Sequence, residues 1–147
     1  MKSLFDSEVY GEILNRIDQL KATDRGQWGK MTVGQMVWHC QVPLKVAVAN
    51  KPNSKKGNLL VRWFFKKSLY NDTPWRKNLP TSPFAKTTEA KDFTTEREKL
   101  RALITEFHQL NNRKTWNPHP LFGRLTHEQW GLMQYKHLDH HLRQFGV

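Results

Sequence analysis

Apolar side chains recur at three- and four-residue intervals along four stretches of this chain, which is the spacing of an amphipathic helix. The stretches cover residues 7–21, 32–48, 94–111 and 126 to nearly 146. No segment shows a convincing strand pattern, and no internal repeat is present. Four long helices with one long crossover predict an all-α four-helix bundle, and 147 residues are the usual size of a single domain, here 1–147.

Two of these stretches begin with the same capping signal. Thr32 is followed three residues later by Gln35, and Thr126 is followed by Gln129 at the same spacing. A threonine and a glutamine so placed satisfy backbone N–H groups at a helix start that no carbonyl of the helix can reach. We therefore expect the second and the last helix to begin directly after Thr32 and Thr126.

The chain between the second and third helices divides into two parts. Residues 58–70 alternate basic with aromatic and aliphatic side chains at helical spacing, which predicts a short extra helix against the bundle. Residues 71–93 contain three prolines and predict an irregular crossover. A loop of this length in a compact domain is usually functional.

Charge is the unusual feature of the composition, because 24 Lys and Arg against 13 Asp and Glu give a net charge of +11. The excess gathers between Lys51 and Lys77. Such a segment attracts phosphates, acidic surfaces or anionic small molecules, although it is also compatible with an ordinary solvated face. Its role stays open.

Two observations bear on the compartment. Cys40 is the single cysteine, so no internal disulfide forms, and its place on the apolar stripe of the second helix predicts a small buried residue. No apolar run approaches the roughly 20 residues of a transmembrane helix. The sequence therefore predicts a cytoplasmic protein without a transmembrane segment.

Histidines carry the candidate chemistry. His137 and His141 are four residues apart and continue the stripe of Trp130 and Met133, so both should face the bundle interior. His39 lies near the apolar face of the second helix. Three neutral imidazoles on facing helices suit a divalent metal ion and leave a coordination position open.

Three neighbours are candidates for supporting or substrate-binding roles. Gln144 lies on the same face as His141 and is placed to hydrogen-bond a ligand or an imidazole. His140 is offset by about 100° from its neighbours and is open to three interpretations: a supporting residue, an alternative ligand or a solvated side chain. Arg143 is a candidate for orienting a substrate.

These motifs resemble the DinB-like superfamily and its YfiT-like metal-dependent thiol transferases. The resemblance rests on His39 in the second helix, on His137 and His141 followed by Gln144, and on the segments 31–36 and 119–126. It implies nickel, zinc or iron in an open three-histidine site, a low-molecular-weight thiol and, in many members, a homodimer. One departure is that Leu142 follows the last histidine, where the family commonly has arginine.

Three functions compete at this point. The first is a metal-binding protein, with or without thiol S-transferase activity on a small molecule, so that its status as an enzyme stays open. The second is a basic bundle that binds nucleic acid or an acidic surface without catalysis. The third is a structural metal that only ties two helices together. The sequence favours the first over nucleic-acid binding, but it identifies neither metal nor substrate.

Overall fold

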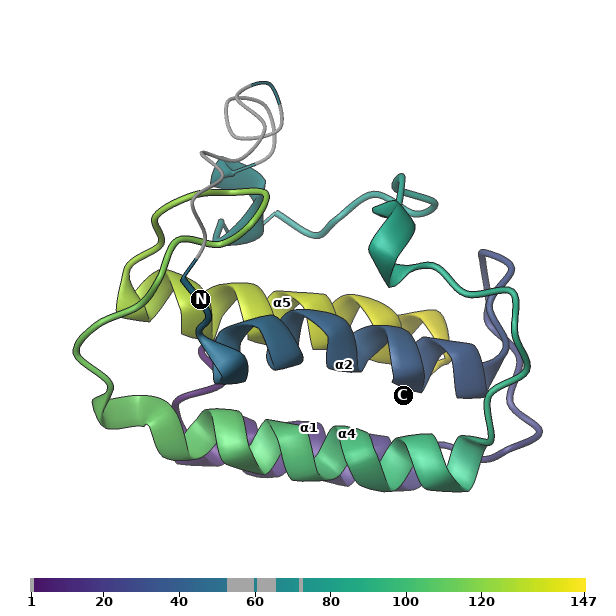
Figure 1. Cartoon of the computed structure of the whole chain (residues 1–147). Helices are drawn as coiled ribbons and strands as arrows, with labels where there is room; N and C mark the ends of the chain where they lie inside the picture. Colours follow the sequence, from purple (N-terminus) through teal and green to yellow (C-terminus); the bar gives the residue numbers. More distant parts are fainter. Residues whose placement is uncertain (1, 53–59, 61–65, 72) are drawn as a thin grey trace.

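The computed structural model describes residues 2–52, 60, 66–71 and 73–147 (Figure 1). Its secondary structure is helical, and the described residues contain two isolated β-bridges but no strand. The long helices are α1 (Ser7–Gln19), α2 (Val33–Ala49), α4 (Phe93–His108) and α5 (His127–Gln144). Three short 3-10 helices are η1 (Lys67–Leu69), η2 (Pro83–Ala85) and η3 (Gln109–Asn112).

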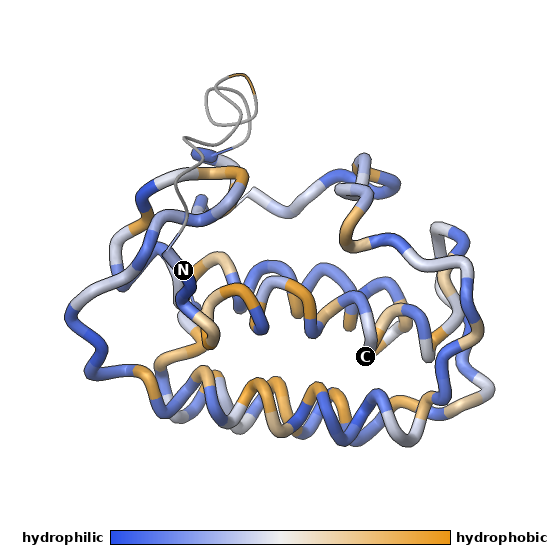
Figure 2. The backbone as a smooth tube through the Cα atoms, viewed as in Figure 1, coloured by the Kyte–Doolittle hydropathy of each residue, from blue (hydrophilic) through white to orange (hydrophobic). Residues whose placement is uncertain are grey.

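The long helices form two layers. Figure 1 shows α2 beside α5 in one layer and α1 beside α4 in the other, with the crossover to α4 passing over the α2 and α5 layer. Apolar positions gather along the faces that meet between the layers (Figure 2). The predicted all-α bundle is therefore confirmed. Its layering places α2 and α5, the two helices with the candidate metal ligands, next to each other.

The two predicted capping boxes are present. Thr32 Oγ1 accepts from the backbone N–H of Gln35, whose side chain accepts from Thr32 N in return. Thr126 and Gln129 make the same reciprocal pair at the start of α5. Each pair satisfies two backbone donors that a helix start otherwise leaves exposed.

The stripes predicted from spacing form the core. Trp130 and Met133 are buried on α5, and Cys40 is buried on α2 with its thiol 3.6 Å from the sulfur of Met36. Burial raises the pKa of the Cys40 thiol, which keeps it protonated and unreactive. Cys40 is thus the small buried residue that its position predicts.

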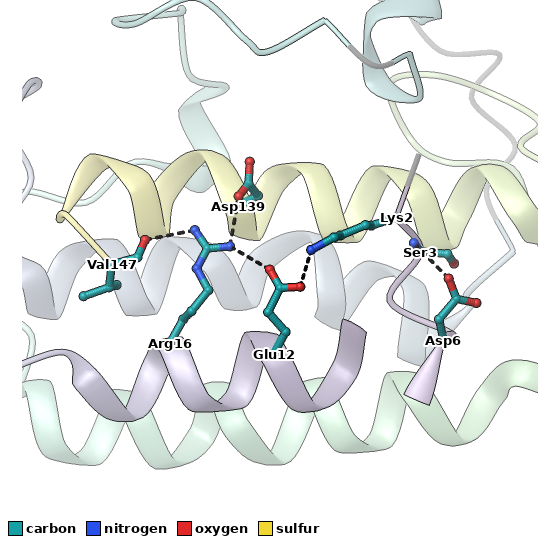
Figure 3. Close-up of polar contacts among 7 residues, drawn as sticks. All are labelled: Lys2, Ser3, Asp6, Glu12, Arg16, Asp139 and Val147. Carbon is teal, nitrogen blue, oxygen red and sulfur yellow. Dashed lines mark hydrogen bonds and ion pairs between the residues drawn. The ribbon is translucent and has the colours of Figure 1, made fainter. Parts of the chain in front are cut away.

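Ionic contacts join α1 to α5 on one side of the bundle (Figure 3). The guanidinium of Arg16 donates to Asp139 Oδ1 at 2.9 Å and to the carbonyl of Val147 at 2.9 Å. Glu12 accepts from Lys2 and lies 3.6 Å from Arg16. Because Asp139 lies between the two metal-candidate histidines of α5, this network helps to hold that part of the helix in position.

The described part of the crossover, residues 71 and 73–92, is irregular, as expected, apart from η2. Most of the helix expected at 58–70 lies outside the described residues; within that segment, residues 67–69 form η1. The Trp75 indole N–H donates to the carbonyl of Ser68 at 2.8 Å, and the Lys136 ammonium donates to Ser68 and Asn71 oxygens. Among the described residues, no helix combines the length and apolar character needed to cross a membrane.

Gly34 allows α2 to pass close to the segment that leads into α4. A methyl group at Gly34 would overlap the backbone carbonyl oxygen of Lys91, whereas one at Gly11 would meet nothing within 4 Å. We expect Gly34→Ala to lower the free energy of unfolding by about 2 kcal/mol, because the backbone of α2 or of Lys91 must shift to make room for the methyl group. We expect Gly11→Ala, also within a helix, to raise it by about 0.5 kcal/mol.

Urea unfolding of the two alanine variants beside the parent protein measures both values. Equal effects at the two positions would show that α2 and the Lys91 backbone are not in close contact.

Candidate metal centre

Three histidines from two helices meet between α2 and α5. His39, His137 and His141 each offer a ligand nitrogen, and these nitrogens lie within 4.8 Å of one another. The Nε2 atoms of His39 and His137 are 3.0 Å apart. The three ring centroids are separated by 4.7 to 4.9 Å, so the rings form a nearly equilateral triangle. The structure thus brings together the three residues singled out in the sequence.

Hydrogen bonds at the far side of two rings determine which nitrogen carries the proton. His39 Nδ1 lies 2.8 Å from the carbonyl oxygen of Ala85 in η2. A carbonyl only accepts, so Nδ1 carries hydrogen and donates it, and in a neutral ring Nε2 keeps its lone pair. Nε2 is also the atom of His39 that faces His137.

Gln144 determines which ring nitrogen of His141 carries the proton. The amide N–H of Gln144 donates to the carbonyl of Trp28 at 2.6 Å, which orients its oxygen toward His141 Nδ1 at 2.8 Å. That oxygen accepts, so Nδ1 of His141 carries the proton and Nε2 is left with a lone pair. This is the hydrogen-bond arrangement that usually supports a metal-binding histidine.

His137 differs from the other two. Its Nδ1 is buried and has no hydrogen-bond partner in the part of the chain that the structure describes. If its Nε2 donates to the lone pair of His39 Nε2, then Nδ1 is a buried acceptor without a donor. If Nε2 has the lone pair, three imidazole lone pairs meet in one site, and a bound cation or a donated hydrogen bond would relieve their repulsion.

Burial keeps these rings neutral. Burial, together with the smaller effect of the nearby His39, lowers the pKa of His141 to about 3. Burial and the neighbouring imidazoles hold the pKa of His137 well below its usual value, and burial also lowers the pKa of His39 against the opposing effect of the Ala85 hydrogen bond. Neutral imidazole is the form that binds metal ions.

His140 and Arg143 lie outside the triangle. The His140 ring is 5.0 Å from that of His141 and sits between the indoles of Trp28 and Trp75, at 5.8 and 5.7 Å. Arg143 is 57% exposed, with Nη1 3.7 Å from Asp139 Oδ2. His140 therefore lies next to the triangle, whereas Arg143 is an exposed residue of the same helix.

The remaining histidines are elsewhere. His108 Nδ1 donates to the carbonyl of Leu4, and its ring stacks on Tyr10. His127 stacks on Phe5 near the start of α5. His119 lies between η3 and α5 and is buried, since its ring packs against Phe122 and Trp130.

Sequence reasoning missed three contributors to the site: Ala85, Trp28 and Trp75. Ala85 acts through its backbone carbonyl, which leaves no signal in a side-chain pattern. The two tryptophans stand in irregular segments, where neither helical nor strand spacing indicates a direction. The expectation that the long crossover has a function was the nearest signal, because Trp75 and Ala85 both belong to it.

The fold and the site define an all-α helical bundle with a cluster of three histidines, two of them buried and one partly buried. The chain belongs to the family described as protein of unknown function (DUF1569), whose model matches residues 3–146. No curated protein and no solved structure matches the chain.

The expected membership of the DinB-like superfamily is therefore wrong. The family model covers nearly the whole chain, and nothing found in the comparisons places the protein in the DinB-like or YfiT-like group. The resemblance rested on short blocks around His39 and His137, and two histidines four residues apart share a helix face in any bundle. The homodimer and the thiol substrate were implied by this resemblance, so the resemblance no longer supports them.

Proposed function

We propose that this protein binds one divalent metal ion through the imidazoles of His39, His137 and His141 and presents it to a small molecule. The observation that carries the proposal is the meeting of three neutral rings, of which those of His39 and His141 are buried and have Nε2 lone pairs left by hydrogen bonds at Nδ1. Without a bound ion such a triangle would destabilise the core, because each buried lone pair without a partner costs stability.

The spacing supports this assignment. Imidazole nitrogens bind zinc at about 2.0–2.1 Å in tetrahedral geometry, so two ligand nitrogens of one ion are about 3.3–3.4 Å apart. His39 Nε2 and His137 Nε2 are 3.0 Å apart, and all three ligand atoms lie within 4.8 Å. Small rotations of the side chains bring the third nitrogen into the same coordination sphere.

Two hydrogen-bond acceptors of the chain support the metal-binding histidines at this centre. Ala85 and Gln144 accept the Nδ1 protons of His39 and His141, which fixes the ring orientation and raises the basicity of Nε2. A divalent ion held by three imidazoles keeps a position for a further ligand and lowers the pKa of a water or thiol bound there.

The identity of the metal and the type of reaction go beyond the proposed metal binding. Imidazole ligands suit zinc, nickel and iron alike, so the ligand set does not choose among them. Thiol transfer was expected from the resemblance to the DinB-like superfamily. Because the family assignment overturns that resemblance, thiol transfer stays an unsupported prediction. The cytoplasmic location and the homodimer also stay predictions.

Metal analysis tests the centre. The protein, purified without a histidine tag and dialysed, is expected to hold about one transition-metal ion per chain. His39→Ala and His141→Ala are expected to hold almost none, whereas His127→Ala, which removes a histidine outside the triangle, should keep the metal. Circular dichroism confirms that each variant folds. Equal metal content in all four proteins would contradict the proposal.

A second measurement separates an open centre from a structural one. In the cobalt-substituted protein, azide is expected to change the visible spectrum in a saturable way, since an open position admits an added ligand. A spectrum that azide leaves unchanged would show a metal that only ties α2 to α5. Metal-independent, strongly salt-dependent binding of RNA or DNA would favour the nucleic-acid alternative.

A further inference from the structure

A cavity of about 240 Å³ lies beside the three-histidine triangle. Its lining includes aromatic rings and charged groups from three parts of the chain: the loop before α2, the crossover and α5. The lining residues used below are Trp28, Trp75, Lys77, Asp139, His140 and Arg143.

Aromatic rings connect the cavity to the candidate metal centre. The indole of Trp75 is 6.0 Å from the ring of His137 and 5.7 Å from that of His140. On the other side, His140 lies 5.8 Å from Trp28 and 5.0 Å from His141. The rings of Trp75 and His140 therefore line the cavity and also lie next to the histidines of the triangle.

The charge of the lining is positive. Lys77, Lys136 and Arg143 face one carboxylate, that of Asp139, among the described lining residues. Asp139 Oδ1 already accepts from Arg16 at 2.9 Å, so its charge is largely compensated from outside the cavity. Lys136 donates to three oxygens of Ser68 and Asn71, and so it contributes charge while it anchors the wall.

Lys77 and Arg143 are the cations placed to meet a ligand. Lys77 Nζ lies over the Trp28 ring, 4.7 Å from its centroid, so an ammonium group stands directly against this aromatic wall. The Arg143 guanidinium is 57% exposed and 3.7 Å from Asp139. A flat apolar surface with cations against it is complementary to a ligand that combines a ring or short chain with an anionic group.

We propose that this cavity binds a small organic carboxylate, with its body against Trp28 and Trp75 and its carboxylate at Lys77 and Arg143. The ligand is the molecule on which the metal centre acts, so the inference rests on the proposed function. Size limits the class, because a cavity of about 150 Å³ holds benzene and drug-sized ligands need about 300 Å³ or more. The volume suits one ring with a short acidic substituent.

Calorimetry with three probes tests the ligand chemistry. Benzoate is expected to bind in a saturable way, whereas benzyl alcohol lacks the charge and acetate lacks the ring, and both should bind more weakly. The double variant K77Q/R143Q is expected to weaken benzoate binding about tenfold, the sum of two partly exposed ion pairs. K114Q removes a lysine that acts on His127 at the start of α5, away from the cavity, and should leave benzoate binding unchanged.

Metal content and cobalt spectra, measured on the same samples, separate this inference from the proposed function. Benzoate should shift the visible spectrum of the cobalt-loaded protein, and K77Q/R143Q should need about tenfold more benzoate for the same shift. A metal-loaded protein whose benzoate affinity is unaffected by K77Q/R143Q overturns the carboxylate site alone. Benzoate binding without a spectral shift overturns its assignment as the ligand of the metal centre. Absence of metal in the parent protein overturns the proposed function and, with it, that assignment.

Discussion

Saturation with zinc or nickel is expected to raise the unfolding temperature of this protein by about 10 °C. A ligand that binds only the folded chain stabilises it by about 4 kcal/mol when present at a thousandfold its Kd. For a domain of about 150 residues, 1 kcal/mol corresponds to about 2–4 °C. The folded chain supplies His39 and the α5 pair within 4.8 Å of one another, an arrangement that the unfolded chain lacks.

Thermal unfolding with and without a chelator measures the shift. His137→Ala should show little shift, because the two remaining imidazoles bind a metal ion far more weakly than three. Magnesium should have no effect on the parent protein, since it prefers oxygen ligands. An equal zinc shift in His137→Ala would place the stabilising ion at some other group of side chains.

Acid is expected to destabilise the fold through His119 by about 3 kcal/mol. This residue is buried, its Nδ1 accepts from the backbone N–H groups of Leu121 and Phe122, and burial lowers its pKa to about 4. The unfolded chain, with a histidine pKa near 6.5, binds the proton more readily. Stability is therefore complete above about pH 6.5 and is lost progressively as the pH falls toward about 4, at roughly 1.4 kcal/mol per unit.

Urea unfolding from pH 7.5 to 4.5 in the presence of a chelator tests this window. His119→Asn keeps an acceptor for the two N–H groups but has no titrating ring, so its stability should fall less steeply than that of the parent. The three-histidine triangle titrates in both proteins and cancels in the comparison. Parallel curves would show that His119 does not contribute to acid unfolding.

Much of the fold could be predicted because helical spacing and capping are local. The capping boxes at Thr32 and Thr126 begin α2 and α5 at the expected residues. The ends were less accurate: α1 ends at Gln19 rather than Lys21, and α4 ends at His108 before the short η3. At a helix end several carbonyls lack partners within the helix, so tertiary contacts decide where it stops.

The candidate site was predictable to a smaller extent. The stripe with Trp130 and Met133 indicated that His137 and His141 point inward, and Gln144 was placed one turn further on the same face. His140 could not be assigned from spacing, because its surroundings come from Trp28 and Trp75, which are distant in sequence. The same reason hid the burial of His119, whose neighbour Trp130 lies on the following helix.

Short-range regularities in this chain determined four helices, their starts and the shared face of the α5 histidines, since each depends on residues within a few positions of one another. Tertiary structure alone decided that α2 lies beside α5, that η2 brings a carbonyl to His39, and that two indoles flank His140. Those contacts join segments far apart in the chain, and they form only when burial of the apolar faces brings the helices and the crossover together.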